Sequence, residues 1–249
     1  MKNWLEINHL SKTFYKNKNW FKKIPLAGGL KKISFTASEE IIGILGESGS
    51  GKTTLVKLIA GIEHPDNDKE AIRLVFEEGF VSKQHPVSLI FQDYTTAINP
   101  EFTVKEALME PLEPIKHSDE AQKKVKEILG KVGLPEKYLT KKAIQLSGGQ
   151  IQRVCIARSL LSDAKVLIFD EAFSSLDLLI TDRLLDLLLQ LKNEFRLHYI
   201  FVTHNLELAT YFCDKLIFLR EGYLEEAIAT EQLMTTTSTY VQALIAAQI

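Results

Sequence analysis

Short hydrophobic runs recur along the chain, each bounded by polar or glycine-rich residues. Runs of this length predict β-strands, and a run in which nearly every position is apolar predicts a strand buried on both faces. The stretch EEIIGILG at 39–46 is of this kind. The strands predicted in this way lie at 34–37, 39–46, 86–92, 165–171, 198–204 and 214–222.

Helical periodicity fills most intervals between these runs. The predicted helices lie at 52–62, 150–161, 178–195 and 205–212. Strands that alternate with helices predict an α/β fold with a mainly parallel sheet. The leucine-rich run Leu176–Phe195 is interrupted by Asp182, Arg183 and Asp186, which predicts an amphipathic helix rather than a membrane span.

Two segments depart from this alternation. Residues 103–161 contain no strand-like run and show helical periodicity, which predicts a helical subdomain inserted at 93–161. Residues 15–33 are predicted to form a loop between two N-terminal strands, with six lysines beside Trp20 and Phe21. A solvated hairpin loop is favoured over a nucleic-acid or lipid contact, because the rest of the chain offers no matching basic face.

Composition narrows the function classes. The 249 residues are 45% hydrophobic and 25% charged, as in ordinary globular proteins, and a net charge of -2 gives no general attraction to nucleic acid or anionic lipid. Cys155 and Cys213 are too few for a disulfide framework and match no metal site, so both are expected to be buried in a reducing compartment. No secretory or transmembrane segment is visible, so any membrane role is expected to come through a partner.

The stretch GESGSGKT at 46–53 lies between a predicted strand and a predicted helix and satisfies the pattern G-x-x-x-x-G-K-[ST]. Its glycines let backbone N–H groups turn toward an anion, and the helix N-terminus adds its dipole. Lys52 is suited to reach the β- and γ-phosphates, Thr53 to ligate Mg²⁺ and Thr54 to contact the α-phosphate. The chain is therefore predicted to bind a nucleoside triphosphate through Gly46, Glu47, Ser48, Gly49, Ser50, Gly51, Lys52, Thr53 and Thr54.

The stretch VLIFDE at 166–171 ends a hydrophobic strand with two acidic residues. Asp170 can place a carboxylate near Mg²⁺, directly or through water. Glu171 is expected to continue the strand, to face the other way, and to accept a proton from an attacking water. Paired acids at a strand end become informative here because the phosphate loop is also present.

A second glycine-rich stretch, LSGGQIQR at 146–153, leads into a predicted helix. The free N–H groups of a helix N-terminus and a serine hydroxyl suit an anion. Two such loops of one compact domain cannot easily grip the same phosphate. The second loop is therefore expected to bind the triphosphate held by another copy or a homologue, in a head-to-tail dimer, through Ser147, Gly148, Gly149 and Gln150.

Together these stretches resemble the motifs of ATP-binding-cassette (ABC) ATPases, in the same order along the chain. LSGGQ resembles the signature, GESGSGKT the Walker A loop, and VLIFDE the Walker B strand with its aspartate and catalytic glutamate. The resemblance implies a P-loop NTPase (RecA-like) core with an N-terminal antiparallel β subdomain and an inserted α-helical subdomain. In one ABC ATPase domain over 1–249, the core with its β subdomain would occupy 1–92 and 162–225, the helical subdomain 93–161 and a C-terminal tail 226–249.

The resemblance also implies functional residues outside the two loops. Gln92 in LIFQD matches the Q-loop glutamine, which contacts Mg²⁺ and water, so Thr53, Gln92 and Asp170 would hold the metal. Asp177 in SSLD matches the D-loop, and His204 in VTH matches the switch histidine near the γ-phosphate.

A further implied contact concerns the base of the nucleotide. Phe14 sits where the family stacks an aromatic ring on adenine, and Tyr15 beside it is a possible substitute.

Three stretches resemble one branch of this family, the ATPases of nickel, oligopeptide and dipeptide importers, and most closely the second ATPase of nickel importers. They are FQDYTTAINPEFTVKEAL, LSGGQIQRVCIARSLL and FCDKLIFLREGYLEE. The resemblance implies a peripheral subunit on the cytoplasmic face of the membrane, with two permeases and an extracellular solute-binding protein. The facing ATPase would be a paralogue or a second copy. Many members continue beyond the equivalent of TYVQALIAAQI with a proline-containing extension that this sequence does not show.

The implied cargo is nickel, cobalt or a metal bound to an opine-type metallophore, and the alternative within the family is an oligopeptide or dipeptide. Two other functions compete. A DNA-maintenance ATPase of the same superfamily would carry a coiled coil or zinc module in the helical region, and neither is visible. A catalytically silent partner subunit is disfavoured because Glu171, His204 and LSGGQ are all present.

Overall fold

The computed structural model describes residues 3–19, 22–26, 28–66, 69–76, 86–91, 97–112, 115, 118–173 and 178–248. The chain forms two compact units. The first combines Met1–Val81 with His198–Ile249, and the second is Ser82–Leu197.

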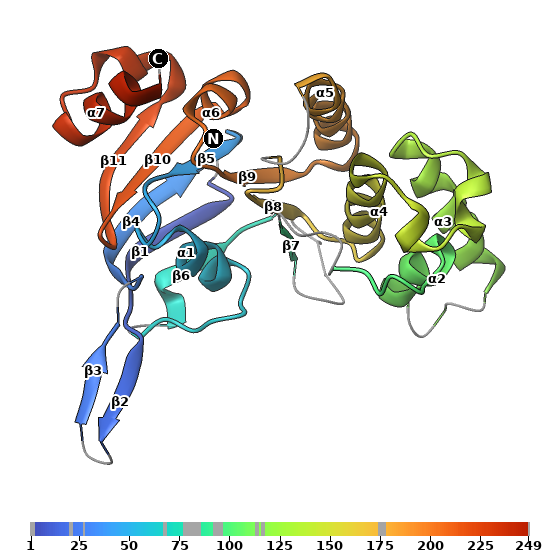
Figure 1. Ribbon diagram of the computed structural model, residues 1–249, viewed down its shortest axis with the longest axis horizontal. Coiled ribbons are helices and arrows are strands. Elements are labelled where there is room, and N and C mark those ends of the chain that lie inside the picture. Colours follow the sequence, from blue (N-terminus) through green and yellow to red (C-terminus); the bar gives the residue numbers. More distant parts are fainter. Residues whose placement is uncertain are drawn as a thin grey trace. The chain divides into compact units, whose positions relative to one another are not determined.

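A sheet of mainly parallel strands forms the centre of the first unit (Figure 1). Its strands follow the order β11-β10-β5-β9, where β5 is Ile42–Leu45, β9 is His198–Val202, β10 is Lys215–Arg220 and β11 is Tyr223–Ala229. All four residues of β5 are buried, as expected for a strand covered on both faces. The strands predicted here from the apolar runs are thereby confirmed, whereas β11 was not predicted.

A three-stranded antiparallel sheet lies in the same unit, in the order β4-β1-β6. Its strands are β1 (Leu5–Lys12), β4 (Leu30–Ala37) and β6 (Ile72–Leu74). Ile33, Phe35 and Ala37 of β4 are buried while the residues between them are exposed, which is the alternation of a strand with one covered face. This sheet is the expected N-terminal antiparallel subdomain.

The region predicted to be a loop at 15–33 contains two further strands, β2 (Tyr15–Asn19) and β3 (Lys22–Pro25). They pair antiparallel and form a hairpin that extends away from β1 and β4 in Figure 1. The prediction missed them because a run rich in lysine and asparagine shows no apolar alternation. Main-chain hydrogen bonds, which side-chain patterns do not report, hold such a ribbon.

Helices complete the first unit: α1 (Lys52–Ile59), α6 (Leu206–Phe212) and α7 (Thr239–Gln248), with 3₁₀ turns at Lys69–Ala71 and Thr230–Thr235. Helix α7 packs beside α6 and buries Tyr240 and Val241. It lies in the segment that the sequence indicated only as a tail.

The second unit has two parallel strands, β7 (Val87–Phe91) and β8 (Val166–Asp170). Its helices are α2 (Val104–Met109), α3 (Asp119–Lys131), α4 (Gly148–Leu161) and α5 (Leu178–Phe195), with 3₁₀ turns at Glu110–Leu112, Glu136–Thr140 and Ala143–Gln145. Thr103 caps α2: its hydroxyl accepts from Glu106 N at 3.2 Å, and Thr103 N donates to the Glu106 carboxylate at 2.7 Å.

Packing among α2, α3 and α4 builds the predicted helical subdomain, and these helices lie close together in Figure 1. Ala107, Val125 and Val154, one from each helix, are at most 1% exposed. Helix α5 is amphipathic as predicted, because its buried leucines lie opposite Asp182 and Asp186, which are exposed. Within the described residues, no helix is long and apolar enough to cross a membrane.

The buried thiols give a test of this packing. Burial raises the pKa of Cys155 to about 12 and raises the pKa of Cys213 as well. At pH 8 only about one part in ten thousand of the Cys155 thiol would be ionised, and the thiolate is the reactive form. Native protein should therefore resist iodoacetamide at pH 8 while unfolded protein is alkylated at both cysteines. Rapid alkylation of the native protein, followed by mass spectrometry, would contradict this packing.

Candidate functional site

The loop that joins β5 to α1 has backbone angles and close contacts that require glycine at two positions. Gly46 has φ 148°, and a Cβ there would lie 2.2 Å from the carbonyl oxygen of Leu219. Gly51 has φ 106°, and a Cβ there would lie 2.6 Å from Leu30 Cδ2. The loop is therefore a tight backbone cradle that side chains would fill.

Lys52 closes this loop from inside. Its ammonium donates to the carbonyl oxygens of Gly46 at 2.6 Å and Glu47 at 2.9 Å, and the residue is 8% exposed. Helix α1 begins at Lys52 and has no acidic residue in its first turn. A buried cation beside the free N–H groups of a helix N-terminus is suited to a phosphate chain.

The other predicted residues of the loop divide into exposed and buried sets. Exposed are Glu47, Ser48, Gly49 and Thr53. Ser50 is buried, and its hydroxyl has no hydrogen-bond partner among the described residues. The Thr54 hydroxyl, for which an α-phosphate contact was predicted, donates to the Gly28 carbonyl at 2.6 Å. Thr54 therefore ties the helix to the β-subdomain in this structure.

His204 lies at the same edge of the sheet as this loop. Strands β5 and β9 are parallel, with Ile44 opposite Val202, so the residues that follow both strands emerge together. His204 is exposed and, with Gly46 and Glu47, lines a cavity of about 120 Å³. The structure thus brings together two motifs that are distant in sequence.

Helix α7 contacts both of these loops. Gln248 Nε2 donates to the His204 carbonyl at 2.9 Å, and its Oε1 accepts from Leu206 N at 2.8 Å. The Tyr240 hydroxyl accepts from Glu47 N at 3.3 Å, and burial raises the pKa of this hydroxyl above its ordinary value. Sequence reasoning missed these residues because the contacts join positions 42 to 193 apart, which no local pattern reports.

The predicted adenine-stacking residues also lie in the first unit. Phe14 is half-buried, and the ammonium of Lys12 lies 5.4 Å from the centroid of its ring. Tyr15 is 56% exposed. Both rings are therefore at least partly accessible.

In the second unit, Asp170 is the last residue of β8, as predicted. Glu171 does not continue the strand: its φ is 53°, in the left-handed region, so the expectation that it faces opposite Asp170 along an extended strand is wrong. A non-glycine residue in this conformation costs about 1–2 kcal/mol, which the surrounding contacts have to offset.

Two contacts hold the turn after Glu171. Gln152 Nε2 donates to the Ala172 carbonyl at 3.1 Å, and the ring of Phe173 packs on Phe169 with centroids 5.5 Å apart. Gln152 belongs to the stretch LSGGQIQR, which resembles the ABC signature, but the sequence predicted no role for it.

Strand pairing also places the start of the predicted Q-loop. Phe91, the last residue of β7, is paired with Asp170 in parallel register. Gln92 follows Phe91 in the chain and lies outside the described residues, as does Asp177.

The signature stretch begins α4, with Ser147 as the N-cap. Ser147 and Gly148 are exposed, and Gly149 and Gln150 are half-buried. Ser147 N donates to Gln150 Oε1 at 3.0 Å, and Gln150 Nε2 donates to the Tyr138 hydroxyl at 3.1 Å. The helix N-terminus is thus open to an external anion.

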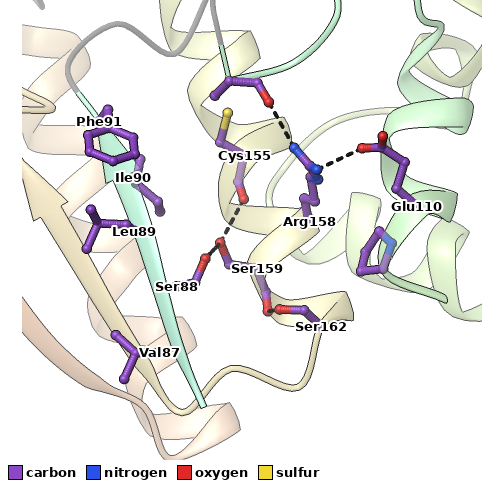
Figure 2. Close-up of a pocket in the computed structure, with 12 residues that line it drawn as sticks. Val87, Ser88, Leu89, Ile90, Phe91, Glu110, Cys155, Arg158, Ser159 and Ser162 are labelled. Atoms are coloured by element: carbon purple, nitrogen blue, oxygen red, sulfur yellow. Dashed lines mark hydrogen bonds and ion pairs between the residues drawn. The ribbon is translucent and has the colours of Figure 1, made fainter. Parts of the chain in front are cut away.

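A larger cavity, of about 500 Å³, lies in the second unit between β7 and α4 (Figure 2). Arg158 on its α4 wall pairs with Glu110 at 2.8 Å and donates to the Ala97 carbonyl at 2.9 Å. On the opposite wall, the hydroxyl of Ser88 lies 2.7 Å from that of Ser159. Sequence reasoning did not predict this cavity. Its charged lining residues are Glu110 and Arg158, and the others are apolar residues and serines.

A family model described as ABC transporter matches residues 30–174, more than half of the chain. The chain belongs to the ABC transporter family. It is therefore an ATP-binding chain whose ATPase activity is coupled to transport.

Relatives of this ABC chain have names that state which cargo their transport systems import. "Metal-staphylopine import system ATP-binding protein CntF" of Staphylococcus aureus is 42% identical over 215 residues, which are 84% of each chain. "Nickel import ATP-binding protein NikE" of Rhodospirillum rubrum is 40% identical over 210 residues, which are 81% of this chain and 76% of that protein.

Solved ABC structures share the fold. CbiO1 from Clostridium perfringens, part of an ABC transporter complex, superposes with a TM-score of 0.76 at 23% identity and full coverage of both chains. The dimeric cassette MJ0796 bound to ADP and Pi gives 0.71 at 25% identity, covering 91% of this chain and 98% of that one. The predicted ABC ATPase fold is therefore confirmed.

The glycine cradle generates a prediction. Gly46→Ala should destabilise the protein by about 1–3 kcal/mol, because its Cβ has no space, and should weaken ATP binding by displacing the loop. Gly130→Ala is the control: Gly130 lies in α3, and no atom lies within 4 Å of the place that an alanine Cβ would take, so a gain of about 0.5–1 kcal/mol is expected. Urea unfolding measures the free energy of unfolding, and titration measures the affinity for ATP. If both quantities were the same for the two variants, the loop would not require glycine at position 46.

Proposed function

We propose that this chain hydrolyses ATP to energise an importer of nickel, cobalt or a metal–metallophore complex. The observation that carries the proposal is the identity of 40–42% to CntF and NikE, spread over more than four-fifths of this chain. Both relatives are named as import ATP-binding proteins for metal or metal–metallophore cargo. The phosphate cradle and the acidic strand end supply the chemistry that such a subunit needs.

The triphosphate fits the loop that begins at Gly46. In the proposed complex, the Lys52 ammonium exchanges the carbonyls of Gly46 and Glu47 for β- and γ-phosphate oxygens. Phe14, or Tyr15, stacks on the adenine ring.

Mg²⁺ also fits the residues present, because the Thr53 hydroxyl is exposed at the start of α1 and the Asp170 carboxylate ends β8. Thr53, Gln92 and Asp170 would hold it, and all three offer the oxygen ligands that this ion prefers. When bound, Mg²⁺ neutralises part of the phosphate charge.

Hydrolysis is assigned to two side chains. Glu171 orients a water and accepts its proton while the water oxygen attacks the γ-phosphorus, and the bond from that phosphorus to the bridging oxygen breaks. His204 donates to the γ-phosphate oxygens and stabilises their charge. The left-handed backbone at Glu171 supports this role, because strain retained in a buried turn is common at reacting sites.

The open N-terminus of α4 supports a composite site. Ser147, Gly148, Gly149 and Gln150 are proposed to bind the triphosphate on the facing ATPase, with Asp177 crossing the same interface. That ATPase is either a paralogue or a second copy of this chain. Each working site would then combine residues of two polypeptides.

The importer further requires two permeases and an extracellular solute-binding protein, which place this subunit at the cytoplasmic face of the membrane. We assign permease docking to the cavity between β7 and α4 (Figure 2), because Phe91 on its wall directly precedes Gln92. Movement at that cavity would thereby reach the nucleotide.

Two substitutions test the roles proposed for Glu171 in hydrolysis and for Lys52 in ATP binding. Glu171→Gln should lower kcat by about a hundredfold or more while ATP still binds and holds a closed dimer. Lys52→Ala should weaken ATP binding by roughly tenfold or more, since it removes charge-assisted hydrogen bonds. ATPase assays, ATP titration and size-exclusion chromatography measure these effects. Normal turnover by the glutamine variant would disprove the role of Glu171.

Cargo is tested by uptake in cells that lack this subunit. Accumulation of radioactive nickel and cobalt, free or with an opine metallophore, should fall to background and return with the wild-type chain but not with Glu171→Gln. Uptake of labelled di- and oligopeptides should stay unchanged. Loss of peptide uptake with normal metal uptake would instead assign this subunit to a peptide importer.

A further inference from the structure

Gln152 occupies a position in α4 that no assigned role explains. It lies two residues beyond Gln150, and its side chain is fully buried at 0% exposure. Its Nε2 donates to the carbonyl oxygen of Ala172 at 3.1 Å. The helix that carries the signature is therefore bonded directly to the turn that follows β8.

That turn is the one that presents Glu171. The residue has φ 53°, in the left-handed region, which costs a non-glycine residue about 1–2 kcal/mol. Ala172, the next residue, is 1% exposed, and its carbonyl is the atom that Gln152 holds. The ring of Phe173 also packs on Phe169, so the turn is held both at its backbone and at a side chain.

Stability does not account for a glutamine here. Gln152 Oε1 is buried and has no hydrogen-bond partner within the part of the chain that the structure describes. An unpartnered buried acceptor costs as much as, or more than, the net gain from the one hydrogen bond that Nε2 makes. Methionine has a similar length and no polar group to bury, so it would fill the position at lower cost.

Neighbouring polar residues of α4 point to different contacts. Arg153 Nη1 donates to the Val132 carbonyl at 2.8 Å, within the helical subdomain, and Gln150 Nε2 to the Tyr138 hydroxyl. Of the hydrogen bonds that these three side chains make within the described residues, only that of Gln152 reaches the turn after β8.

We infer that Gln152 is a positioning residue that couples the two ATP sites of the dimer through this chain. The inference rests on the proposed function, in which residues 147–150 bind the facing ATPase's triphosphate while Glu171 acts on this chain's own. A displacement of the α4 N-terminus by the first nucleotide is transmitted through Gln152 to the Ala172 carbonyl, and so to the backbone that orients Glu171.

The test uses Gln152→Met in the assembled transporter. Removal of the donor should lower kcat about tenfold and bring the Hill coefficient for ATP toward 1, with ATP affinity and melting temperature close to wild type. Gln242→Met controls for the loss of a glutamine-to-carbonyl hydrogen bond elsewhere in the chain, because Gln242, an exposed residue of α7, donates from Nε2 to the Thr236 carbonyl at 2.9 Å. The control should leave kcat and cooperativity unchanged.

Gln152→Glu adds a pH readout that a purely structural role would not give. A protonated carboxyl can donate to the Ala172 carbonyl, whereas a carboxylate cannot, and burial raises the pKa of such a carboxyl. The kcat of this variant, divided by that of wild type, should therefore rise as the pH falls from about 8 to about 6.

Several results overturn the inference: a Gln152→Met enzyme with wild-type kcat, a Hill coefficient that does not change, or a flat pH ratio for Gln152→Glu. A joint fall of kcat, ATP affinity and melting temperature would also overturn it, since that pattern marks lost packing. Failure of the proposed function gives a different result, in which wild-type transporter does not hydrolyse ATP or Glu171→Gln hydrolyses it normally.

Discussion

Parallel strand pairing in register is the constraint that places the candidate functional residues within each of the two units. Strands β5 and β9 pair with Ile44 opposite Val202, so the phosphate loop and His204 emerge at one edge of the first unit. Strands β7 and β8 pair with Phe91 opposite Asp170, so the same rule operates in the second unit. A slip of one residue in either pair would turn every side chain of that strand to the opposite face and displace the residues that follow the strand.

The backbone at the site is held in conformations that most residues avoid. Gly46 and Gly51 satisfy this requirement by having no side chain, and both lie against neighbouring backbone or side-chain atoms. Glu171 does carry a side chain, and the Gln152 and Phe173 contacts hold the turn that follows it. If Glu171 has the proposed role, the cost of its left-handed backbone is the cost of orienting that carboxylate.

Much of the fold could be predicted because its burial pattern is local. The four buried residues of β5 and the alternating faces of α5 can be read from consecutive letters, and the phosphate loop follows from its glycines. The β2–β3 hairpin has no such pattern, so its main-chain pairing was missed. Tyr240 contacts Glu47 across 193 positions, and the left-handed turn at Glu171 follows an ordinary strand sequence. These features depend on tertiary contacts that no window of sequence contains.

The division of labour in an ABC transporter explains why cargo is the part of the function that local chemistry does not report. The roles proposed for Lys52, Glu171 and His204 all concern phosphate, and ATP hydrolysis releases the same free energy whatever the cargo is. A nickel chelate and a peptide differ only at surfaces that belong to the permeases and the solute-binding protein. The argument for metal cargo is therefore the similarity to CntF and NikE, which extends over more than four-fifths of this chain and so well beyond the residues of the phosphate site.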